Sequence, residues 1–262
     1  AASAIVALGI IGAQKGWFKS KADTLESVEA KVVEFVGSVD SLSAAFDGSA
    51  EFAPMPQMNM KVSINSTVDC LMQGNQTLFR MEGASNAVIP NMPPIDSPFV
   101  LVCNGTDMFI EQTTMGMTMA IQQPMPTAMA PTSGNLPKEL LKKLHAIATL
   151  KLMKSELLDG EEAYVIQATP LPGQEQDLAL PGGKKLASIT IYIAKTMSQI
   201  RLVAADDAGA QIASVALKDI LTNLPFESSR FTYAPPSGVA VMKMEDLIKQ
   251  MPGGMPGMPA MP

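Results

Sequence analysis

The sequence predicts an α+β protein built around one antiparallel sheet, and three observations support this prediction. Between residues 160 and 241, short runs of alternating apolar and polar residues are separated by turn residues. Such runs are typical of an antiparallel meander. One face of these runs is apolar, so we expect the sheet to be covered on that side. Residues 23–37 and 137–147 instead repeat apolar residues every three or four positions, which predicts two covering helices.

The C-terminal half contains the clearest strand patterns. Ile189, Ile191 and Ile193 fall on one face of their run, and the polar residues between them fall on the other. A turn over 206–209 separates two later runs, and Pro235 and Pro236 follow the last one. The predicted strands of this half are 163–169, 188–193, 199–204, 211–218 and 230–233.

The N-terminal half begins with a helix signal and continues with strands. Asp23 and Glu26 have the spacing of a capping box, and the helix should end near Gly37. Asn104 and Gly105 lie between two apolar runs and predict a tight hairpin turn. The expected strands begin near Ser41 and include 58–65, 77–82, 99–103 and 107–112, whereas Pro90, Pro93, Pro94 and Pro98 predict a loop.

Both ends of the chain differ in composition from its middle. Residues 1–13 are almost wholly apolar but are too short for a membrane-spanning helix, which needs ~20 residues. A remnant of a signal peptide, an anchor fragment and a partner-docking segment are the alternatives. A short helix signal over 243–250 precedes a Met/Pro/Gly tail. We therefore divide the chain into an apolar segment 1–22, a single domain 23–242 and a helix with tail 243–262.

The order of these parts resembles the periplasmic outer-membrane lipoprotein-carrier (LolA-like) family. Members of that family close their sheet with a phrase of the type Phe-x-Phe-x-Pro-Pro-x-Gly-Val-x-Val. Residues 78–82 are similar to a family strand that contains Arg-Trp-Glu, and 99–112 are similar to a family hairpin. The closing phrase is matched by Phe231, Tyr233, Pro235, Pro236, Gly238, Val239 and Val241.

The resemblance implies a fold, a function and a compartment. The fold would be a curved antiparallel sheet forming a half-open β-barrel, covered by the helices 23–37 and 137–147. The function would be non-enzymatic binding of a lipid or lipoprotein acyl chain in the cleft between sheet and helices. An exported protein of the periplasm or cell envelope of a Gram-negative-type bacterium is implied, with membrane-anchored and extracellular forms as alternatives.

Seven residues are the candidate ligand-binding positions on the concave face. Six lie on the apolar side of their strands, and Arg80 matches a family position, with a solvated strand arginine as the alternative. The candidates are Phe79, Arg80, Met81, Leu101, Phe109, Met117 and Met119. A rival function is that of a structural or assembly subunit, whose apolar termini dock on partner proteins or on further copies of the chain.

Composition argues against several classes of protein. A net charge of −6 disfavours nucleic acid or an anionic membrane as the main partner. The single histidine, His145, and the absence of a phosphate-binding or nucleophile motif leave catalysis unsupported, so we predict no enzyme and no cofactor. Cys70 and Cys103 would suit a disulfide in an exported protein, with two buried thiols as the alternative.

Methionine is the unusual component of the chain. There are 20 methionines against nine phenylalanines, three tyrosines and one tryptophan. Flexible methionines can line a cavity for apolar ligands. Thioethers also bind Cu(I), and the spacing of 55–60, of 115–119 and of the tail suits that metal. Because methionines at every second strand position face one side, we favour the lining and predict no metal site.

Overall fold

The computed structural model describes residues 23–55, 58–74, 76–125, 136–174 and 186–246. The predictions for the N-terminal segment 1–22, the tail and most of both long loops lie outside these residues. Six strands occupy the N-terminal half: β1 (Ser41–Met55), β2 (Met58–Gln73), β3 (Gln76–Val88), β4 (Ile95–Cys103), β5 (Asp107–Thr114) and β6 (Met117–Pro124). The others are β7 (Ala148–Leu152), β8 (Glu156–Leu158), β9 (Glu161–Pro170), β10 (Ser188–Ala194), β11 (Ile200–Ala205), β12 (Gln211–Thr222) and β13 (Val241–Lys243).

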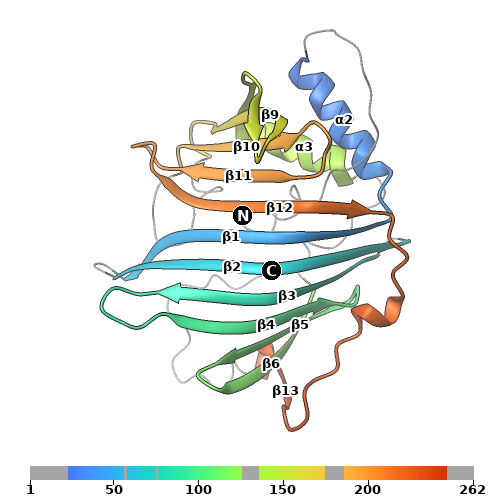
Figure 1. Ribbon diagram of the computed structural model, residues 1–262, viewed down its shortest axis with the longest axis vertical. Coiled ribbons are helices and arrows are strands. Elements are labelled where there is room, and N and C mark those ends of the chain that lie inside the picture. The colour runs from blue at the N-terminus through green and yellow to red at the C-terminus, as the bar shows by residue number, and fades with distance from the viewer. Residues whose placement is uncertain (1–22, 56–57, 75, 126–135, 175–185, 247–262) are drawn as a thin grey trace.

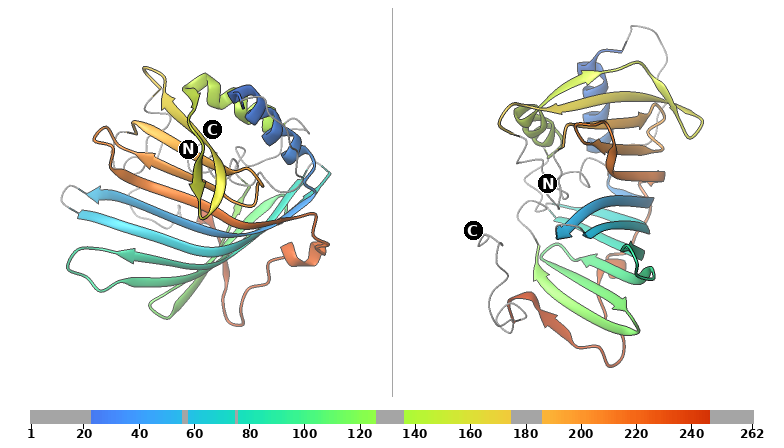
Figure 2. Two further views of the ribbon diagram at one scale, coloured as in Figure 1. Left: turned by 45° about the horizontal axis from the view of Figure 1, so that its top comes forward. Right: turned by 90° about the vertical axis from the view of Figure 1, so that its left-hand side faces the viewer.

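These strands form one large, curved, unclosed sheet, as Figures 1 and 2 show. Its order is β13-β6-β5-β4-β3-β2-β1-β12-β11-β10-β9-β7, with β8 also paired to β9. All pairs are antiparallel except β13 with β6. Two meanders, β1 to β6 and β9 to β12, are joined where β1 pairs with β12. The predicted curved antiparallel sheet is therefore confirmed.

The two predicted helices are present and lie at one end of the sheet. Helix α2 (Leu25–Gly37) begins with a capping box made by Thr24 and Ser27, one residue later than the sequence predicts. Helix α3 (Leu136–Ile147) contacts α2, and both contact β7 (Figure 1). The helices therefore cover only part of the sheet.

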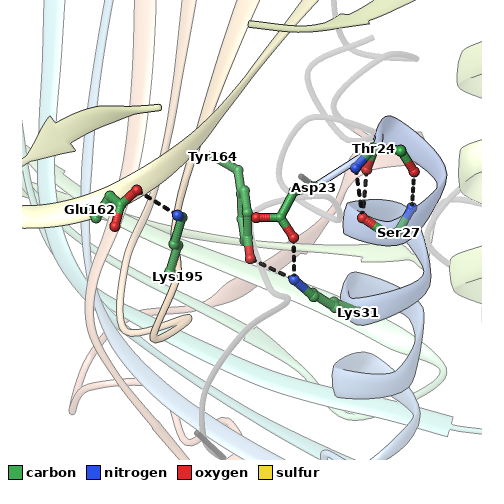
Figure 3. A network of polar contacts seen from close by, with 7 residues as sticks. All are labelled: Asp23, Thr24, Ser27, Lys31, Glu162, Tyr164 and Lys195. Atoms are coloured by element: carbon green, nitrogen blue, oxygen red, sulfur yellow. Dashed lines mark hydrogen bonds and ion pairs between the residues drawn. The ribbon is translucent and has the colours of Figure 1, made fainter. Parts of the chain in front are cut away.

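Polar contacts fasten both α2 and the loop that follows β10 to β9. The Nζ atom of Lys31 donates to Asp23 and to the Tyr164 hydroxyl, at 2.7 Å each (Figure 3). These two hydrogen bonds raise the pKa of Lys31, and the one with Asp23 has the larger effect. Lys195 pairs with Glu162 at 2.5 Å on the other side of Tyr164. The amino groups of Lys31 and Lys195 lie 5.0 and 5.3 Å from the centre of the Tyr164 ring.

The main core lies between the helices and the C-terminal meander. We call this side of the sheet the helix-bearing face and the opposite side the outer face. The alternating isoleucines of β10 point into this core, as the period-two pattern predicts. Its buried members include Val28, Val32 and Phe35 of α2, Leu42 and Phe46 of β1, Ile189, Ile191 and Ile193 of β10, and Ile200 and Leu202 of β11.

Close contact between β2 and β3 occurs at Gly83. A Cβ atom placed there would lie 2.1 Å from the carbonyl oxygen of Asn65 and 2.4 Å from the Cβ of Ser66. No side chain fits at such distances, so only glycine permits this approach of the two strands.

The segment 224–240, which we call the strap, differs from its prediction. Residues 230–233 were expected to form a strand, but Ser228–Phe231 form a 3-10 helix and the strap contacts β3. Its Arg230 binds the buried Asp69 of β2 with an Nε–Oδ2 distance of 2.6 Å. Tyr233 donates to Glu111 at 2.7 Å. The strap then leads into β13 at the edge of the sheet (Figure 1).

Pro98 also differs from its predicted loop. It lies within β4 and is paired with Ala84 of β3. The ladder between β4 and β5 begins one residue later, at Phe99. Pro98 thus occupies a strand position at which only one neighbouring strand is paired, which a residue without an amide hydrogen tolerates.

Candidate functional site

An apolar row crosses the helix-bearing face beyond the helices. Met81 of β3 is opposite Leu101 of β4, and the register continues through β5 and β6 to β13. Opposed residues in a sheet point to the same face, so their side chains lie next to one another. The row consists of Met81, Leu101, Ile110, Ile121 and Met242, and each of these residues is half-buried.

The row is long enough to hold an extended hydrocarbon chain. Five strands at ~4.8 Å spacing give a length of ~19 Å. One lipid chain spans half of the ~30 Å hydrocarbon core of a bilayer, or ~15 Å. Phe79 and Met81 pack against the main core and so connect it to the row. The described helices contact β7, at the end of the sheet opposite to β13. The row therefore extends the apolar surface of the core beyond the part of the sheet that the helices cover.

Neighbouring rows on the same face add a few polar groups. One contains Phe79, Cys103, Met108 and Gln123 at paired positions, and the other contains Gly83, Phe99, Gln112 and Met119. Ser66 is opposite Gly83, and its buried Oγ atom has no hydrogen-bond partner among the described residues. The face can thus bury an apolar chain while offering isolated hydrogen-bonding groups at its margins.

The structure places five of the seven predicted residues on this face. Phe79, Met81 and Leu101 lie in or beside the row. Met119 and Met117 lie two and four positions before Ile121 on β6 and therefore share its face. They are largely exposed, at 52% and 71%.

Two predicted residues, Arg80 and Phe109, lie on the outer face. Phe109 stacks on Tyr233 of the strap, with ring centres 5.1 Å apart. Arg80 pairs with Glu82 and donates to the main-chain oxygen of Arg230 at 3.4 Å. The prediction that Phe109 points to the concave side is therefore wrong, because the strap makes the outer face apolar there too. Arg80 belongs to the contacts that hold the strap.

Sequence reasoning missed three members of the row. Ile110 of β5 and Ile121 of β6 were not singled out. Met242 lies on β13, a three-residue strand whose parallel pairing with β6 has no local signal in the sequence. The alternation in β6 could have found Ile121, whereas β5 is apolar on both faces around Ile110.

Both cysteines are free and buried, so the disulfide considered from the sequence is not formed. Cys70 and Cys103 are each opposite Phe79, on the two strands that flank β3. Two strand spacings give ~10 Å between their Cα atoms, which exceeds the ~7 Å limit of a bridge. Burial raises the pKa of Cys70 to about 12 and also raises the pKa of Cys103.

The outer face carries the charged contacts of this half of the sheet. Arg80, Glu82, Phe226 and Arg230 line a shallow hollow of about 520 Å³ beside the strap. Burial and the hydrogen bond to Glu111 raise the pKa of Tyr233. In this hollow each arginine already has a carboxylate partner. We interpret these groups as the fastening of the strap.

The described residues contain no cluster of three or more His, Cys, Asp or Glu side chains suited to a metal ion. None of the helices in this part of the chain has the length and hydropathy needed to cross a bilayer.

No protein-family model matches the chain, and no curated protein matches it. Solved structures with a similar arrangement include an uncharacterized conserved protein from Thermus thermophilus, with 13% identity and a TM-score of 0.46 over 84% of this chain and 99% of that one. LprF from Mycobacterium bovis has 12% identity and a TM-score of 0.45 over 77% of this chain and 94% of LprF. A putative outer membrane lipoprotein-sorting protein domain from Vibrio parahaemolyticus has 11% identity and a TM-score of 0.26, covering 73% and 89%.

Proposed function

We propose that this chain is a non-enzymatic carrier that binds a lipid or lipoprotein acyl chain along the apolar row of the helix-bearing face. The observation that carries the proposal is the row itself, Met81 to Met242, which continues the main core with half-buried apolar side chains. A surface of this kind needs an apolar partner to exclude water. Its length of ~19 Å suits one extended chain.

The driving force would be the removal of hydrocarbon from water. Each methylene that leaves water contributes ~0.8 kcal/mol, so about ten methylenes supply the ~8 kcal/mol that corresponds to micromolar binding. Methionines at both ends of the row and at Met119 are flexible and can fit chains of different shape. The isolated polar groups at the margins would accept a headgroup or an ester without fixing its identity.

The predicted residues take different parts in this proposal. Phe79, Met81 and Leu101 would contact the chain from the side of the core. Met119 and Met117 would contact it from the hairpin end of β6. We also propose that the protein is exported and acts in the periplasm or cell envelope, as the resemblance of its sequence implies.

Two adjacent residues of β4 offer a matched test. Leu101 lies in the row and Val100 lies on the outer face, and both are half-buried. We expect Leu101→Gln to weaken binding of a dansyl-labelled fatty acid by about tenfold, since one buried leucine contributes ~1.5–3 kcal/mol. Val100→Gln should change it less than twofold.

Mass spectrometry of lipids extracted from the native protein would identify the natural ligand. Equal loss of binding in both variants, or no fatty-acid binding by the parent, would refute the carrier proposal. A parent that binds no lipid but forms oligomers in light scattering would instead favour the assembly subunit.

A further inference from the structure

Two neighbouring hairpins have apolar, uncharged tips at one end of the sheet. The first tip, residues 88–95, joins β3 to β4, and the second, residues 114–117, joins β5 to β6. They lie side by side because β4 pairs with β5, and Ser97 Oγ is 2.9 Å from Thr114 Oγ1 just behind them. Figure 1 shows both tips on the same side of the molecule. Their exposed apolar residues are Val88, Met92, Met115 and Met117, at 42%, 49%, 76% and 71%.

Neither tip contains a charged residue, and the charge nearest to the first tip along the chain is Asp96, the second residue of β4, which accepts a hydrogen bond from the Asn86 side chain. The stretches 83–95 and 112–125 contain no Asp, Glu, Lys or Arg. The turn 206–209 at the same end of the sheet is acidic, and its Asp206 accepts hydrogen bonds from the main chain of Ala208 and Ala210. An uncharged apolar tip can enter a low-dielectric medium without desolvating an ion, whereas the acidic turn disfavours a negatively charged surface.

The second tip places methionine where the backbone disfavours it. Thr114 and Met117 are paired, so Met115 and Gly116 form a two-residue turn, and their φ angles are +52° and +78°. Asparagine or glycine is preferred at the position of Met115, because a larger side chain is strained at positive φ. Strain at an exposed apolar residue indicates that this side chain serves something other than folding.

We propose that these two hairpin tips insert into the surface of an electrically neutral lipid bilayer. A fluid bilayer fits this arrangement better than a protein partner, because the tips are separate projections ~10 Å apart. They also lack the tryptophan, tyrosine and arginine residues that anchor most protein interfaces. The tips lie apart from Leu101, Ile110 and the rest of the row, and the variants that test this inference leave Met117, the tip residue assigned to the ligand, unchanged.

Partition of the full chain onto sucrose-loaded phosphatidylcholine vesicles tests the proposal. We expect the double variant Met92→Asn/Met115→Asn to partition at least tenfold more weakly than the parent. Leu157→Asn is the matched control, because Leu157 is 74% exposed on β8, away from the tips, and it should change partition less than twofold. Vesicles that contain phosphatidylglycerol should bind the parent more weakly than neutral vesicles.

The single variant Met115→Asn separates an effect on folding from an effect on vesicle binding. Asparagine suits the positive φ angle, so the Tm should rise while vesicle binding falls. A parent that does not bind neutral vesicles, or a double variant that binds within twofold of it, would overturn the proposal. So would a change of mass in light scattering on replacing the tips, since that result would make them a protein interface.

Discussion

The ion pair between the strap and β2 permits a quantitative test. The Asp69 side chain is 6% exposed and accepts from Arg230, whose Nε lies 2.6 Å from Oδ2. Replacing Arg230 by glutamine leaves the carboxylate buried without its cation and removes the strongest polar contact of the strap. We expect a large loss of stability from this single change on a partly exposed side chain.

The size of the effect follows from the geometry. Two charges ~4 Å apart attract by ~4 kcal/mol at an effective dielectric constant of ~20. Removing one partner of a buried pair costs ~3–5 kcal/mol. Arg230 is 45% exposed, so solvent screening reduces the expected loss of stability to ~3 kcal/mol, the lower end of this range. The control is Arg201→Gln, whose partner Asp159 is 3.4 Å away and whose pair is exposed at 36% and 49%. That change should cost less than ~1 kcal/mol.

Urea unfolding measures both variants. With an m value of ~3 kcal/mol per molar, Arg230→Gln should lower the midpoint by ~1 M and the control by less than a third of that. Adding Asp69→Asn to Arg230→Gln should restore part of the loss, because the buried charge is then gone. Equal midpoints for Arg230→Gln and Arg201→Gln would refute the reasoning.

Two further predictions concern titratable groups. Cys70 and Cys103 should resist a thiol reagent in the native protein, because both are buried. Both should react once guanidinium has unfolded the protein, without added reductant. Absence of reaction in guanidinium would mean that the two cysteines form a disulfide. Because the pKa of Lys31 is raised in the folded protein, the charged side chain stabilises the fold. This stabilisation is fully present below the unfolded pKa of ~10.4 and is lost as the pH rises through the higher pKa of the folded protein. The difference in stability between the parent and Lys31→Met should therefore be larger at pH 8 than at pH 11, and a constant difference would contradict the assignment.

Strands and helices were predictable where the signal is local. Alternation marks β10, and the Asn104-Gly105 turn between two apolar runs marks the hairpin of β4 and β5. The helical spacing of α2 likewise predicts its apolar stripe of Val28, Val32 and Phe35. In α2 and β10 the side that points into the core is the only strongly apolar side.

The errors arose where a distant segment decides the environment. Met108, Phe109 and Ile110 are apolar on both sides of β5, so alternation alone cannot orient this strand. Tyr233, far along the chain, covers Phe109 and makes the outer face suitable for it. Arg230 was predicted in a strand, yet its bond to Asp69 and the burial of Phe231 hold that segment across the sheet. Such contacts leave no periodic trace in the sequence.

The pairing of β1 with β12 has a consequence for how the chain reaches its native state. Ser43 is opposite Leu221, so this ladder joins residues from the two extremes of the domain. Sheets with many such distant pairs fold in milliseconds to seconds rather than microseconds, because long loops must close before the contacts form. Until β12 has been synthesised, the hydrogen-bonding edge of β1 has no partner and is open to pairing with other chains. The cross-strand pair of Asp47 with Lys218, at 2.7 Å, adds opposite charges to this late ladder and so favours the correct partner over a second copy of β1.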